Sequence, residues 1–212
     1  MRRLVLVSCL LPVLGAEALP GLEPLFEDRT TETELHFVHT NGMTGSLFYP
    51  EVMGAGAALL DYDGDGDLDA YLMQGSFLDP EIEPNRILGS WTGDRIPGDR
   101  LFRNDLDRAT GELRFRDVTE QAGIHALGYG QALATGDLEG DGDPDLFLAN
   151  FGDDELWENL GNGTFREVSA ARGLGDPGWS SAATFADIDG DGLLDLFVVR
   201  YVHWSLEENP TC

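Results

Sequence analysis

The chain has 212 residues and carries 39 acidic against 13 basic side chains, which gives a formal net charge of −26 at pH 7. A surface this acidic repels nucleic acid and anionic membranes, so proteins that bind either polyanion through basic patches are excluded. Hydrophobic residues make up 42% of the chain, which is enough to bury a core.

The first 18 residues have the pattern of a secretory signal peptide. Arginines follow the initiating methionine, an apolar run extends from residue 4 to 14, and Ala16 and Ala18 form an A-x-A cleavage signal. The apolar run is about half of the ~20 residues that a membrane-spanning helix needs, which disfavours a membrane anchor. A lipoprotein signal at Cys9 would leave almost no hydrophobic region before that cysteine. We expect cleavage after Ala18 and a secreted or extracellular protein, periplasmic or cell-surface in a bacterium, with no membrane span.

Residues 19–52 form an N-terminal segment that precedes the acidic motifs of the chain. Within it, Phe26–Thr30 reads F-E-D-R-T, and the same F-x-D/E-x-T/S element recurs at 115–119 and 165–169. We interpret this element as an outer β-strand that arrives before the inner strands of its sheet.

A nine-residue acidic loop occurs three times and organises the rest of the chain. Positions 1, 3, 5 and 9 are acidic in all three copies, and positions 4 and 6 are glycine. Carboxylates this close repel one another unless a cation lies among them, and calcium takes six to eight oxygen ligands at about 2.3–2.6 Å. We expect side-chain ligands at positions 1, 3, 5 and 9, the last through both oxygens, and a main-chain carbonyl at position 7. The candidate calcium ligands are Asp61, Asp63, Asp65, Asp67 and Asp69 in the first loop, Asp137, Glu139, Asp141, Asp143 and Asp145 in the second, and Asp187, Asp189, Asp191, Leu193 and Asp195 in the third.

These loops differ from the calcium loop of an EF-hand. Position 12, where an EF-hand has a glutamate, is Leu72, Leu148 and Val198. Short apolar runs rich in aromatic and β-branched residues flank each loop, and such runs predict buried strands. Each loop therefore links two strands of a hairpin. The alternative, an acidic turn without metal, is disfavoured because three copies occur in register.

A longer repeat surrounds the loops. The second and third loops begin at residues 137 and 187 and are 50 residues apart, as are the elements at 115–119 and 165–169. A period near 50 with four strand-like pieces per unit predicts an all-β protein, a β-propeller of four-stranded blades. The predicted units are a blade at 53–125 with an insertion at 74–99, a blade at 126–175 and a partial blade at 176–212, or about two and a half blades of an incomplete propeller.

These motifs resemble a known family. The acidic hairpins, followed by N-x-G-N-G-T-F-x-x-V, are similar to FG-GAP (VCBS-type) repeats, the calcium-bearing blades also found in integrin α subunits. Segments 37–42, 50–56, 201–204 and 209–212 resemble the cartilage acidic protein (ASPIC/UnbV) family. The resemblance implies an extracellular calcium-binding propeller with an interaction role and no established catalysis.

The chain departs from the family pattern in two places. Glu139 occupies position 3 of the second loop, where the family has aspartate or asparagine, so we expect that site to be the weakest or most distorted of the three. The chain also stops where the family's propeller continues, as in a truncated N-terminal portion. After signal cleavage Cys212 is the remaining cysteine, which predicts pairing with another chain or a partner outside this sequence.

No catalytic motif stands out. The four histidines lack zinc-site spacing, and no nucleophile elbow, P-loop or dinucleotide fingerprint is present. We therefore expect a non-enzymatic, secreted calcium-binding propeller scaffold for protein or glycan interaction or adhesion. The alternative is an accessory propeller of a larger secreted enzyme whose catalytic part lies beyond residue 212. The histidines are His36, His39, His125 and His203.

Overall fold

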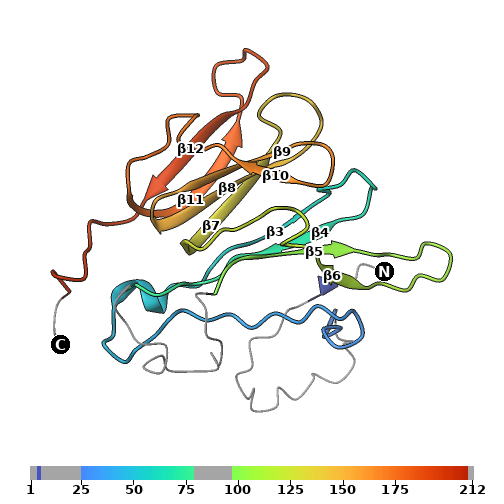
Figure 1. Cartoon of the computed structure of the whole chain (residues 1–212), viewed down its shortest axis with the longest axis horizontal. Helices are drawn as coiled ribbons and strands as arrows, with labels where there is room; N and C mark the ends of the chain where they lie inside the picture. The colour runs from blue at the N-terminus through green and yellow to red at the C-terminus, as the bar shows by residue number, and fades with distance from the viewer. Residues whose placement is uncertain (1–3, 6–24, 79–96, 210–212) are drawn as a thin grey trace.

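The computed structural model describes residues 4–5, 25–78 and 97–209, which are mostly strands and the turns between them (Figure 1). Most of the predicted signal peptide, and residues 79–96 of the predicted insertion, lie outside the described residues. One short 3-10 helix, η1 (Tyr49–Val52), accompanies the strands in the described ranges. None of the helical structure described there is long and apolar enough to cross a bilayer.

Two antiparallel sheets of the same design follow each other along the chain, which confirms the predicted all-β class. The first has the order β3-β4-β5-β6, and in the second β7 pairs with β8, β8 with β9 and β9 with β10. A third unit is the hairpin β11–β12, and the start of β11 also pairs with the end of β8. The strands are β3 (Ala57–Leu60), β4 (Asp69–Leu72), β5 (Arg100–Asn104), β6 (Phe115–Asp117), β7 (Tyr129–Gly136), β8 (Asp145–Gly152), β9 (Glu155–Asn159), β10 (Phe165–Glu167), β11 (Gly178–Ala186) and β12 (Asp195–Arg200).

The three units stack face to face, and β8 lies between the first unit and the β11–β12 hairpin (Figure 1). Leu146 and Leu148 belong to the same core cluster as Tyr71 of the first unit. Phe147 and Ala149, whose side chains point the opposite way, pack towards the β11–β12 hairpin. Because both faces of β8 are buried, the strand reads as a continuous apolar run instead of an alternating one. This stacked, antiparallel arrangement is consistent with a β-propeller-like fold.

The N-terminal segment covers the free face of the first sheet. Leu35 and the partly buried Phe37 pack against Phe102 and Phe115, on the face turned away from the second unit. The Phe115 N–H also donates to the Thr33 carbonyl at 2.7 Å. One side of the stack is therefore closed by chain that lies outside the repeats.

The element Phe26–Thr30, predicted as an outer strand, contains a two-residue strand. β2 (Phe26–Glu27) pairs in parallel with β1 (Leu4–Val5), which lies in the predicted signal peptide. Within the described part of the chain, no strand of the three stacked units pairs with β2. Its role as the outer strand of a blade therefore stays a prediction.

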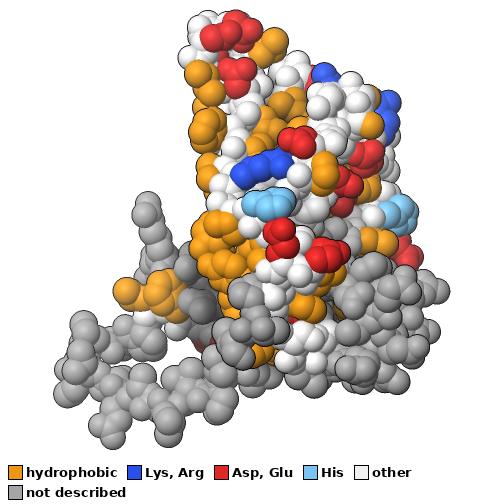
Figure 2. Space-filling model, turned by 90° about the vertical axis from the view of Figure 1, so that its left-hand side faces the viewer, with side chains coloured by type: hydrophobic (Ala, Val, Ile, Leu, Met, Phe, Trp, Pro, Cys, Tyr) orange, Lys and Arg blue, Asp and Glu red, His pale blue; other side chains and the backbone are white. Residues whose placement is uncertain are grey.

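The opposite side of the stack, formed by β12, is open. Phe197 is 56% exposed, although Tyr71 and Phe147 at the same place in the other units are 0% exposed. Val199 is also exposed, and among the described strands β12 pairs with β11 alone. Figure 2 views the molecule from the side on which β12 lies and shows hydrophobic side chains along that face below a cap of acidic ones. An apolar edge of this kind favours pairing with another chain.

We expect the protein to self-associate through the β12 side. The double change Phe197→Lys and Val199→Lys should weaken association at least tenfold, because it places charge on the apolar face. Light scattering during gel filtration in reducing buffer measures the mass without a contribution from Cys212, which lies outside the described residues. Leu160→Lys, in the β9–β10 turn, is the control and should leave association unchanged. A monodisperse monomer at every concentration contradicts this prediction.

Candidate metal centre

Each acidic loop joins the two strands of a hairpin and wraps around its first aspartate. The glycines at positions 4 and 6 have positive φ in all three loops, for example 74° at Gly64 and 85° at Gly66, a conformation that favours glycine. The N–H of position 6 donates to the carboxylate of position 1 in every loop, at 2.9, 2.8 and 3.0 Å in chain order. The positive φ angles explain the two glycines of each loop, and the repeated contact explains the aspartate at position 1.

The aspartate at position 5 makes the second contact that all three loops share. Its carboxylate accepts the N–H of position 7 at 2.9, 3.1 and 2.8 Å in the three loops. At position 7 of the first loop, the Asp67 side chain points away to Arg108, with a separation of 2.5 Å. The predicted ligation by the carbonyl of position 7 stays a prediction. The residues at these two positions are Asp65 and Asp67, Asp141 and Asp143, and Asp191 and Leu193.

Carboxylates converge in the first and third loops. One oxygen from each of three residues lies within 4.8 Å of the others, at positions 1, 3 and 5 of the first loop and at positions 1, 3 and 9 of the third. In the first loop, burial and the neighbouring Asp65 charge raise the pKa of Asp63. The converging residues are Asp61, Asp63 and Asp65, and Asp187, Asp189 and Asp195.

One oxygen of the first loop has no donor. Asp61 Oδ1 is buried and accepts no hydrogen bond within the described part of the chain, whereas Asp61 Oδ2 accepts the Gly66 N–H. A buried carboxylate oxygen without a partner is costly. A hard cation held by Asp61, Asp63 and Asp65 would remove that cost, so the donor set of this loop fits calcium.

Position 9 has a structural role that the sequence did not reveal. The Asp69 carboxylate accepts the Tyr62 N–H of its own loop at 3.0 Å and the Asn104 N–H at the end of β5 at 2.8 Å. Asp145 likewise accepts one N–H from its own loop, at 2.9 Å, and that of Asn159 at the end of β9, at 2.8 Å. We call this bridge from loop to third strand the aspartate latch. Burial raises the pKa of Asp69 to about 6 and that of Asp145 in the same direction.

Asp195 occupies the same position in the third loop without a complete latch. Its carboxylate accepts the Ile188 N–H at 3.0 Å, but the described residues of the third unit include no third strand to supply a second donor. Asp195 is exposed, whereas Asp69 and Asp145 are buried. Its carboxylate therefore faces the other acids of the loop, which explains why position 9 joins the cluster here.

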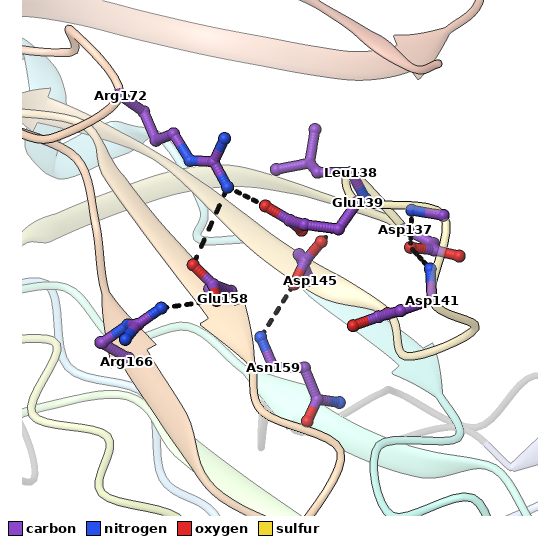
Figure 3. Close-up of polar contacts among 10 residues, drawn as sticks. Asp137, Leu138, Glu139, Asp141, Asp145, Glu158, Asn159, Arg166 and Arg172 are labelled. Carbon is purple, nitrogen blue, oxygen red and sulfur yellow. Dashed lines mark hydrogen bonds and ion pairs between the residues drawn. The ribbon is translucent and has the colours of Figure 1, made fainter. Parts of the chain in front are cut away.

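The second loop does not bring its carboxylates together. It is absent from the convergent acidic groups of the described residues. Glu139, at position 3, pairs with Arg172, which also lies 3.9 Å from Glu158 (Figure 3). Arg166 pairs with Glu158 from the other side at 2.7 Å. Sequence reasoning singled out Glu139 but missed these three partners.

A separate cavity of about 590 Å³ lies beside β9, and its lining is rich in carboxylates. Burial raises the pKa values of Asp154 and Glu155. The cavity is also lined by Ser169, whose hydroxyl is a possible nucleophile. That hydroxyl accepts the Leu156 N–H at 2.8 Å. The expectation that the chain is not an enzyme stays a prediction.

Comparison with known families supports part of the resemblance. The sequence profile described as FG-GAP-like repeat matches residues 137–198, from the first aspartate of the second loop to β12. No curated protein matches the chain. The chain therefore contains an FG-GAP-like repeat that spans the second and third acidic loops.

Proposed function

We propose that the protein is an exported, calcium-binding β-propeller scaffold of the cartilage acidic protein (ASPIC/UnbV) type, which presents its surface to a protein or glycan partner. The observation that carries the calcium assignment is the first loop. Three carboxylates converge there, and one oxygen of Asp61 is buried without a described donor.

Calcium would be held by Asp61, Asp63 and Asp65 in the first loop and by the convergent trio of the third. The ion supplies positive charge that offsets the repulsion among carboxylates and ties the two strands of the hairpin together. Few protein oxygens converge in each loop, so affinity should be weak, with Kd of about 10⁻⁴–10⁻³ M. That range suits extracellular calcium modules.

The scaffold role is supported by the FG-GAP-like repeat at 137–198 and by the absence of a cofactor motif in the sequence. Repeated sheets stacked through apolar faces provide a rigid platform, and partners can be bound by the loops and edges that the stack presents. A net charge of −26 makes anionic partners unfavourable. We therefore assign protein or glycan contact, and not nucleic-acid binding, to this surface.

Calorimetry tests the calcium assignment. Asp65→Ala should remove one site, because it deletes one of the three converging carboxylates. Asp67→Ala is the matched control: it removes the same charge from a side chain that points to Arg108, so the site should remain. At calcium concentrations 100-fold above Kd, each filled site should stabilise the fold by about 2.7 kcal/mol. A folded protein that binds no calcium contradicts the proposal.

A further inference from the structure

The carboxylate at position 3 of the second loop is turned out of the loop. Glu139 reaches Arg172, in the turn after β10, and the two form an ion pair (Figure 3). Glu158 of β9 lies near the same guanidinium nitrogen, with its Oε2 atom 3.9 Å from Arg172 Nη2. The Glu139 and Glu158 side chains are 29% and 17% exposed, and the Arg172 side chain, which reaches them from the surface, is 49% exposed.

Charges alternate along this cluster. Arg166 pairs with Glu158 at 2.7 Å, and Arg172 follows between Glu158 and Glu139. Two acids are thus balanced by two arginines that belong to the protein itself. A guanidinium presents five N–H donors and stays charged at every accessible pH, so it is well suited to hold two carboxylates.

Within its described residues, the first unit has no equivalent of the Arg172–Glu139 ion pair. Aligning the repeats places Ala122 where the second unit has Arg172, and Arg103 where it has Glu158. Arg103 binds Asp105, at 2.7 Å. Asp63, at position 3 of that loop, stays with its convergent group. The same loop geometry therefore gathers its acids when no arginine occupies the position of Arg172.

We propose that the Arg172 guanidinium takes the place of a calcium ion in the second loop, so that the protein binds two calcium ions and not three. This inference rests on the proposed function. Calcium could enter the second loop with Glu139 as a ligand only by displacing Arg172, which would leave that guanidinium with Glu158 alone. The unit in the middle of the stack thereby keeps its loop in place when calcium is withdrawn.

Counting bound ions tests the inference directly. Native mass spectrometry and calorimetry on the full chain should give two calcium ions for the wild type. Arg172→Ala, which installs the residue present at the matching place in the first unit, should give three. The third ion should bind at least tenfold more tightly than any calcium in the second loop of the wild type.

Two further variants make the result specific. Arg166→Ala removes an arginine from the same cluster but leaves the Arg172–Glu139 pair, so it should still bind two ions. Glu139→Asp shortens the acid by one methylene so that it no longer reaches Arg172, and it should bind three ions even if Arg172→Ala fails to fold. A wild type that binds three ions overturns the inference and leaves the proposed function standing. The same holds if Arg172→Ala and Glu139→Asp each bind only two ions. A wild type that binds none overturns the proposed function and this inference with it.

Discussion

Replacing Asp145 with alanine should lower the free energy of unfolding by about 3 kcal/mol in calcium-free buffer. The change removes the acceptor of two main-chain N–H groups, one in the second loop and that of Asn159 at the end of β9. Each buried donor left without an acceptor costs roughly 1–3 kcal/mol. Asp145 is 1% exposed, so water cannot replace the lost bonds without rearrangement of the sheet.

The matched control is Asp195→Ala, at the same position of the third loop. Asp195 is exposed, its carboxylate accepts the Ile188 N–H, and no described third-strand donor reaches it. Its replacement should cost less than about 1 kcal/mol without calcium and should matter only when the metal is present. Asp69→Ala, with a complete latch, should behave like Asp145→Ala.

Denaturant unfolding followed by tryptophan fluorescence, with chelator present, separates the two classes of aspartate. Equal losses for Asp145→Ala and Asp195→Ala would show that the latch adds nothing to stability. A loss at Asp145 that appears only with calcium would show that position 9 acts solely as a metal ligand.

The hairpins and their loops could be predicted from the sequence because their causes are local. The two glycines and the acids of each loop, with the apolar runs on either side, lie close together in the sequence. The apolar run of β8 predicted a buried strand, and the stacked units bury it on both faces.

The latch and the arginine cluster could not be predicted because their partners lie far away along the chain. Asn104 is 35 residues from Asp69, and Arg172 is 33 residues from Glu139. Spacing within a motif says nothing of such contacts. A signal existed in the repeat alignment, where charged Arg172 stands opposite apolar Ala122. A difference between two copies of one unit marks a place where the copies have different partners.

The N-terminal segment shows a different limit. Its F-x-D/E-x-T/S element matched the outer strands of the repeats, yet β2 pairs with β1 instead of with a stacked sheet. Leu35 and Phe37, which pack the segment against the first unit, follow no repeat pattern. Apolar contacts of this kind depend on which face is left free, and only the assembled stack determines that.

Asp99 should make the stability of the protein depend on pH between about 4 and 7. It lies just before β5 and is 4% exposed. Its carboxylate accepts the Gln74 N–H at 2.7 Å and the Tyr71 hydroxyl at 2.9 Å. Burial, followed by a smaller contribution from the Glu155 charge, raises the pKa of Asp99 to about 7, against hydrogen bonds and Arg100, which lower it.

The sign follows from the raised pKa. The folded state binds the Asp99 proton more tightly than the unfolded state, so this contribution to stability is complete below about pH 4 and is lost as pH rises towards 7. The difference between about 7 and the ordinary 3.8 corresponds to as much as about 4 kcal/mol. Asp99→Asn removes the titration and keeps an oxygen for the Gln74 N–H. The variant should therefore gain stability relative to the wild type as pH rises from 4 to 8.

Asp105→Asn is the control, because its effect on stability should change with pH in the opposite direction. A hydrogen bond from Arg103 lowers the pKa of Asp105, so the wild type should gain stability over this variant as pH rises through the acidic range. Both variants are compared with the wild type by denaturant unfolding at a series of pH values in chelator, so that changes in calcium binding do not contribute. The buried Asp99 carboxylate and the charged Asp105 carboxylate then shift stability in opposite directions with pH. A pH-independent difference between Asp99→Asn and the wild type would mean that Asp99 keeps an ordinary pKa despite its burial.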